Sequence, residues 1–86
     1  VLKDIALIRL ARVQMEQEKY DIALANLTSV SSVSYAAQVE EVKGDVYQRQ
    51  GKFEEAEKAY SEALASNGGS NLLQMKLDDL ASQKQG

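Results

Sequence analysis

Apolar residues recur every three or four positions along most of the chain, a spacing typical of helices that bury one side. The pattern predicts helices over residues 2–17, 22–30, 35–50, 53–66 and 72–81. The first is apolar around most of its circumference, so we expect it to be buried on more than one face and to pack against a preceding part of a longer protein. The last has a single apolar stripe, which is typical of a helix that covers the end of a stacked array.

The segments between these helices have the composition of turns and loops. Gly51 is expected to end the third helix, because glycine adopts the left-handed conformation at little cost, and Asp21 or a neighbour is expected to cap the second. The serine-rich residues 29–34 are predicted to form a loop, and without histidine or a Gly-x-Ser-x-Gly sequence they do not suggest a serine nucleophile. Residues 67–71 should stop the fourth helix, since they lack the Gly-Lys-Ser/Thr ending of a phosphate-binding loop. Residues 83–86 are expected to fray.

Residues 44–63 are predicted to form a helical hairpin around which the chain is organised. Small residues stand where its two helices must approach closely, and aromatic residues fill the space between them. The small residues are Gly44, Ala56 and Ala63, and the aromatic residues are Tyr47, Phe53 and Tyr60. Such a hairpin cannot bury its apolar faces alone, so it needs helical neighbours.

The chain also repeats itself at a spacing of 33 residues. The same residue type recurs in the pairs Val13 and Val46, Gln17 and Gln50, Lys19 and Lys52, and Ala23 and Ala56. A repeat of about 34 residues made of two helices is the tetratricopeptide signature. We therefore predict a single all-α domain of two tetratricopeptide-like helical hairpins and a capping helix, part of a right-handed α-solenoid. The first repeat covers residues 4–36, the second residues 37–70 and the capping helix residues 71–82.

The second copy resembles the tetratricopeptide consensus closely at its small and aromatic positions. It departs from the consensus at Glu40 and Lys43, which replace large apolar residues, and we expect Val39 and Val42 to take over their packing. The first copy is more degenerate. The motif predicts a fold and says little about the partner.

Composition narrows the function. The chain has 86 residues, a net charge of −3 with both signs interspersed, and neither Cys nor His. Without a Lys/Arg cluster, binding to nucleic acid or to an anionic membrane surface is not expected, and the common zinc, thiolate and imidazole chemistries are absent. The carboxylates lie outside apolar stretches, so none is expected to be buried with a pKa near neutrality. We therefore expect no enzyme activity, no catalytic residue, no metal, no cofactor and no small-molecule substrate.

A closer resemblance covers nearly the whole chain. The segments IRLARVQ, VKGDVYQRQGKFEEA and LLQMKLDDLA are similar to the C-terminal part of the YfgM-like family of ancillary Sec-translocon subunits. This resemblance implies a scaffold on the periplasmic side of the bacterial inner membrane, held there by an N-terminal anchor absent from this chain. It also implies the Sec translocon and periplasmic chaperones as partners. A cytoplasmic location is the alternative when the resemblance is set aside.

In tetratricopeptide arrays the first helix of each repeat lines a concave groove, so the resemblance also implies where a protein partner would bind. The corresponding positions are Ile5, Ile8, Arg12, Met15, Glu16, Gln38, Glu41, Asp45, Gln48 and Arg49. The Lys and Asn that clamp a terminal carboxylate in chaperone-tail-binding repeats are absent. An amphipathic helix or an extended segment anchored by apolar residues would suit this groove.

Two alternatives stand beside this interpretation. In one, Ile5, Ile8 and Met15 only pack against a preceding repeat, and the chain is a structural spacer or cap at the end of a longer array. In the other, the chain is a general peptide-binding repeat module with no link to the translocon.

Overall fold

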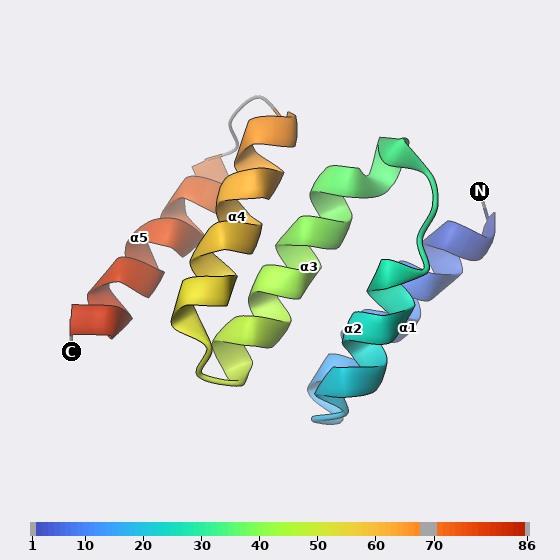
Figure 1. Cartoon of the computed structure of the whole chain (residues 1–86), viewed down its shortest axis with the longest axis horizontal. Coiled ribbons are helices and arrows are strands. Elements are labelled where there is room, and N and C mark those ends of the chain that lie inside the picture. The colour runs from blue at the N-terminus through green and yellow to red at the C-terminus, as the bar shows by residue number, and fades with distance from the viewer. Residues whose placement is uncertain (1, 68–70, 86) are drawn as a thin grey trace.

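The computed structural model describes residues 2–67 and 71–85, and in these ranges the chain is almost entirely helical (Figure 1). The residues predicted to stop the fourth helix, 68–70, and the end of the predicted tail, Gly86, lie outside the described residues. The elements are α1 (Leu2–Glu16), α2 (Tyr20–Thr28), a short 3₁₀ helix η1 (Val33–Tyr35), α3 (Ala36–Arg49), α4 (Phe53–Asn67) and α5 (Asn71–Gln85). The all-α fold of helical hairpin repeats predicted from the sequence is confirmed.

The helices pack as two hairpins and a closing helix. α1 pairs with α2, α3 pairs with α4, and α5 packs against α4, while α3 also contacts both helices of the first hairpin. In Figure 1, α1 lies behind α2, and α3 stands between the first hairpin and α4. The arrangement is a slab with extents of 39 × 30 × 15 Å.

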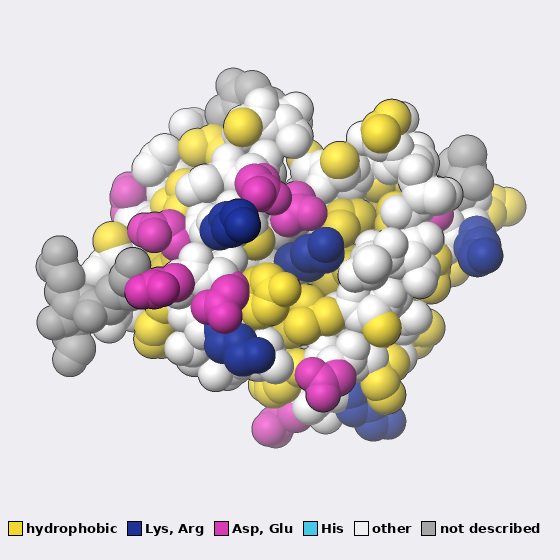
Figure 2. Space-filling view, viewed as in Figure 1, with side chains coloured by type: hydrophobic (Ala, Val, Ile, Leu, Met, Phe, Trp, Pro, Cys, Tyr) yellow, Lys and Arg dark blue, Asp and Glu magenta, His cyan; other side chains and the backbone are white. Residues whose placement is uncertain are grey.

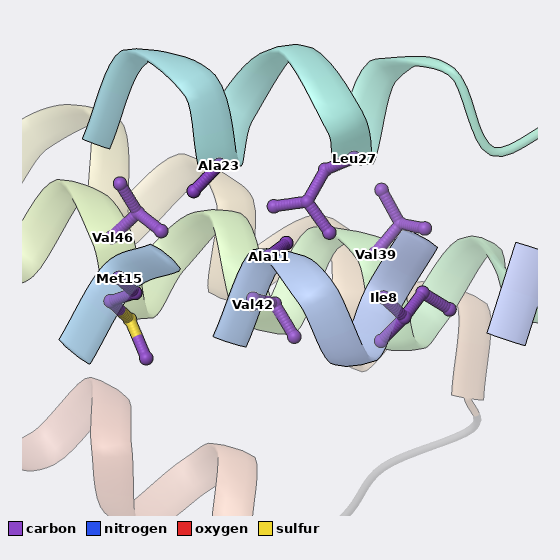
Figure 3. Close-up of a cluster of buried hydrophobic side chains, with 8 residues drawn as sticks. All are labelled: Ile8, Ala11, Met15, Ala23, Leu27, Val39, Val42 and Val46. Carbon is purple, nitrogen blue, oxygen red and sulfur yellow. The ribbon is translucent and has the colours of Figure 1, made fainter. Parts of the chain in front are cut away.

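Buried side chains form two clusters, one on each side of α3. In the first cluster, Ala23 and Leu27 point from α2 toward α1 and α3, as Figure 3 shows. Its other members are Ile8, Ala11, Met15, Val39, Val42 and Val46. The burial of Val39 and Val42 confirms that they take over the packing of the consensus apolar positions.

The second cluster joins α4 to α5. Its buried members are Ala56, Tyr60, Ala63, Leu73 and Leu80, with Tyr47 and Phe53 packed against them. The small and aromatic residues of the predicted hairpin therefore lie where helices meet. Leu73 and Leu80 follow Val39 and Val46 by 34 residues, so α5 occupies the place of a first helix in a third repeat.

Two turns use the same left-handed backbone conformation. Gly51 has a φ of 78° and closes the turn between α3 and α4, as the sequence predicted. Glu18 has a φ of 63° in the turn between α1 and α2. The two residues are 33 positions apart, so the repeat extends to the backbone conformation of its turns.

The helix boundaries correct three predictions. α2 begins at Tyr20, and its cap position is Lys19, which makes no side-chain capping bond, so Asp21 lies in the first turn instead of at the cap. The serine-rich connection is a loop only in part, because η1 occupies Val33–Tyr35. Residues 83–85, predicted to fray, continue α5.

Asp4 is the exception to the prediction that no carboxylate is buried in an apolar stretch. It lies in α1 and its exposed fraction is 5%. Its two carboxylate oxygens accept hydrogen bonds from the backbone nitrogens of Ser31 and Ser32, at 3.2 and 3.1 Å. This buried carboxylate fixes the serine-rich connection to α1, which is a structural role.

Candidate functional site: the face formed by α1, α3 and α5

Polar contacts between α1, α3 and α5 show that these three helices share one face. Arg49 on α3 binds Glu16 on α1 through both guanidinium nitrogens, with N–O distances of 2.8 and 3.3 Å. Gln48 on α3 donates to the side chain of Gln83 on α5 at 3.1 Å. We call this surface the α1–α3–α5 face; it comprises the ten groove residues predicted from the sequence together with Arg9, Tyr35, Phe53, Lys76 and Gln83.

The strongest electrostatic contact on this face is the one Lys76 makes with α3. Its Nζ lies 2.8 Å from a carboxylate oxygen of Glu41 and 3.2 Å from one of Asp45. Burial lowers the pKa of Lys76, but hydrogen bonds and attraction from the two carboxylates outweigh that effect, so its pKa lies above the ordinary value. The ammonium group therefore stays charged and holds α5 to α3.

Tyr60 reaches the same network from α4. Its hydroxyl donates a hydrogen bond to Asp45 and lies 3.2 Å from the side-chain oxygen of Gln48. Burial, the hydrogen bond to Asp45 and the nearby negative charges of Asp45 and Glu41 all raise the pKa of Tyr60. Lys76 also stands 5.7 Å from the centre of the tyrosine ring, within the range of a cation–π contact.

Two hollows lie along the α1–α3–α5 face. The larger, of about 610 Å³, spans the three helices and reaches the start of α4; it is lined by Met15, Asp45, Gln48, Arg49, Phe53 and Gln83. The smaller, of about 300 Å³, lies between α1 and the start of α3. It is lined by Ile5, Ile8, Arg9, Arg12, Tyr35 and Gln38.

The structure distributes the ten predicted groove residues between these hollows and the ion pairs beside them. Eight line one of the two hollows, and the other two, Glu16 and Glu41, pair with Arg49 and Lys76. Ile8 and Met15 differ from the others because each is only 6% exposed and belongs to the first buried cluster. Both therefore pack within this chain, and only their edges reach the hollows.

Sequence reasoning missed the contribution of α5, which supplies Lys76 and Gln83. The available signal was the continuation of the repeat, since Leu73 and Leu80 follow Val39 and Val46 at the same spacing. It also missed Arg9 and Tyr35 in the smaller hollow and Phe53 in the larger.

The visible opposite side of the slab carries a different pattern. Figure 2 shows the side with α2 toward the viewer, where acidic and basic side chains alternate around a patch of apolar ones. Within residues 2–67 and 71–85, no group of three Asp or Glu side chains is placed to hold a metal ion. In the same ranges, no helix has both the length and the hydropathy needed to cross a bilayer.

The family profile of the tetratricopeptide repeat-like domain matches residues 1–82. The chain belongs to this family. It is also similar to the ancillary SecYEG translocon subunit of Neisseria gonorrhoeae (strain ATCC 700825 / FA 1090), with 43% identity over 84 residues. The alignment covers 93% of this tetratricopeptide-like chain and about 40% of the length of that relative. No solved structure matches the chain significantly.

Proposed function

We propose that this chain is a non-catalytic protein-interaction module of a SecYEG-associated protein, and that its α1–α3–α5 face holds the partner. The similarity to a named ancillary translocon subunit carries this proposal. The face supports it, because ion pairs and hydrogen bonds from α3 to α1 and α5 fix three helices into one surface. Stacked helical repeats commonly use such extended surfaces to bind other proteins.

Site-specific crosslinking tests the use of this face. A photoreactive amino acid at Gln38, which is exposed in the smaller hollow, should crosslink to SecYEG reconstituted in lipid nanodiscs. The same amino acid at Ser61, exposed on α4, is the matched control and should give little product. Equal crosslinking from both positions, or none from Gln38, would contradict the assignment of the face.

The proposal extends to the periplasmic side of the bacterial inner membrane and to periplasmic chaperones as further partners. A fusion of alkaline phosphatase to the C-terminal end of the full-length protein should be active, because that enzyme needs the disulfide bonds formed in the periplasm. A fusion that is inactive although the protein is produced would favour the cytoplasmic alternative.

A structural spacer or cap is the second candidate function. The burial of Leu73 and Leu80 favours it, since α5 uses these residues to cover the second cluster. In that case a crosslinker at Gln38 would be silent, while positions elsewhere in the longer protein would react with SecYEG. The two candidates therefore give opposite results in the same experiment.

A further inference from the structure

Arg9 and Arg12 stand out among the charged residues of the α1–α3–α5 face. Both are exposed, both line the smaller hollow, and neither makes a hydrogen bond or an ion pair with any residue in the described ranges. As residues three apart in α1, they lie on the same side of the helix, where like charges destabilise it slightly. Their placement therefore contributes nothing to the stability of the helix.

The carboxylates that could neutralise these arginines are engaged elsewhere. Glu16, four residues after Arg12 and so on its side of the helix, is bound by Arg49 at 2.8 Å. Glu41 and Asp45 on α3 are bound by Lys76. The α1–α3–α5 face thus carries four cations against three acids, on a chain whose net charge is −3.

The lining of the smaller hollow differs from that around other exposed cations. Lys58 lines a hollow together with Glu40, Glu55 and Glu62, and Lys52 lines one together with Glu54 and Glu55. No carboxylate lines the hollow that holds Arg9 and Arg12. Its remaining residues supply an aliphatic side chain, an aromatic ring and an amide: Ile5, Ile8, Tyr35 and Gln38.

We propose that this hollow binds an acidic, amphipathic segment of the partner protein, with a Glu or Asp side chain on Arg9 and Arg12 and a neighbouring aliphatic side chain against Ile5 and Tyr35. The proposal rests on the interaction function above and names the chemistry of the partner. Charge complementarity and the apolar wall together select this occupant, since a guanidinium pair suits carboxylates and a volume of about 300 Å³ suits one anchoring side chain.

A pair of synthetic peptides tests the proposal on the purified chain. Each peptide has about 15 residues, enough to form a helix on binding, and presents Leu with either Glu or Gln four residues later. Acetylated and amidated ends remove the terminal charges. In fluorescence anisotropy, the Glu peptide should bind about three- to tenfold more tightly than the Gln peptide, and added salt should reduce the difference.

The matched variants are Arg9→Gln/Arg12→Gln and Lys19→Gln/Lys52→Gln. Both remove two positive charges from exposed positions, but Lys19 and Lys52 lie at the hairpin turns. The arginine variant should bind the two peptides equally, whereas the lysine variant should keep the preference for the Glu peptide. Equal binding of both peptides by the unmodified chain would overturn the proposal, as would an equal loss of preference in the two variants.

Two further measurements separate this proposal from its neighbours. If inorganic phosphate or anionic vesicles bind through Arg9 and Arg12 while the Glu peptide shows no preference, the hollow is a general anion site and the proposal is wrong. Crosslinking from Gln38 to SecYEG that persists without any peptide preference would also overturn it and leave the proposed function standing. A peptide preference without crosslinking to SecYEG would support the hollow and contradict the proposed function.

Discussion

Gly44 leaves no room for a side chain at the closest approach of α3 and α4. A Cβ at this position would lie 2.5 and 2.6 Å from two ring atoms of Tyr60. The ring cannot move away easily, because it is fully buried and its hydroxyl is hydrogen-bonded on α3. Its rigidity makes Gly44 a sensitive test of the hairpin.

We therefore expect Gly44→Ala to lower the free energy of unfolding by about 1–3 kcal/mol. At an ordinary position within a helix the same change would raise it by about 0.5–1 kcal/mol, so the sign of the effect is diagnostic. Urea denaturation followed by circular dichroism measures it. A variant more stable than the unmodified chain would show that the helices can separate at Gly44.

The two left-handed turn residues give a reciprocal prediction. Glu18 adopts a conformation that costs a residue with a Cβ about 1–2 kcal/mol, whereas Gly51 adopts it freely. Glu18→Gly should raise the free energy of unfolding by about 0.5–1 kcal/mol, and Gly51→Ala should lower it by about 1 kcal/mol. Thermal melts of both variants check the pair, and a loss of stability in Glu18→Gly would contradict the repeat in backbone conformation.

At the residue scale, the sequence revealed the positions whose residue type is itself the signal. Gly51 was predicted because glycine marks a left-handed turn, but Glu18 was not, since glutamate carries no such mark. Only its place 33 residues before Gly51 could have identified it. Asp4 was missed for a related reason: its hydrogen-bond donors are the backbone nitrogens of Ser31 and Ser32, and backbone groups leave no trace in a sequence.

At the scale of the elements, packing explains why helix boundaries departed from prediction. Residues 83–85 have the polar composition of a frayed end, yet Gln83 on α5 receives a hydrogen bond from Gln48 on α3. Local composition cannot show a contact between elements 35 positions apart. The same limit applies to the α1–α3–α5 face, where Lys76 became visible only once α5 was placed against α3.

The attachment of α4 and α5 to α3 should weaken at alkaline pH. The pKa of Tyr60 is raised above its ordinary value of 10.0, so the folded chain holds this proton more tightly than the unfolded chain does. Its contribution to stability is then complete below pH 10 and is lost as the pH rises above it. Lys76, whose pKa is also raised, acts in the same direction.

We expect the unmodified chain to lose about 1 kcal/mol more stability than Tyr60→Phe between pH 10 and pH 11, because the variant has no proton to release on unfolding at this site. Urea denaturation at each pH measures the difference. Between pH 7 and pH 9 the two curves should run parallel, which serves as the internal control. Equal losses above pH 10 would show that Tyr60 ionises without opening the α3–α4 contact.

At the scale of the whole molecule, the two clusters make the slab a short linear array. The first cluster contains residues of α1, α2 and α3, and the second contains residues of α4 and α5. In arrays of this kind, stability is approximately a sum of repeat terms and interface terms between nearest neighbours. Damage to one cluster should therefore be felt most in the helices that form it.

Leu80→Ala and Leu27→Ala test this linear behaviour, because the two leucines are buried equivalents in different clusters, with exposed fractions of 0% and 1%. Each change should cost about 2–5 kcal/mol in its own cluster. Amide hydrogen exchange should accelerate mainly in α4 and α5 for Leu80→Ala, and mainly in α1 and α2 for Leu27→Ala. Uniform acceleration in both variants would instead show that α3 couples the clusters into one cooperative unit. A partner bound across α1, α3 and α5 would then stabilise the entire slab at once, whereas in a linear array it would stabilise each hairpin through its own contacts.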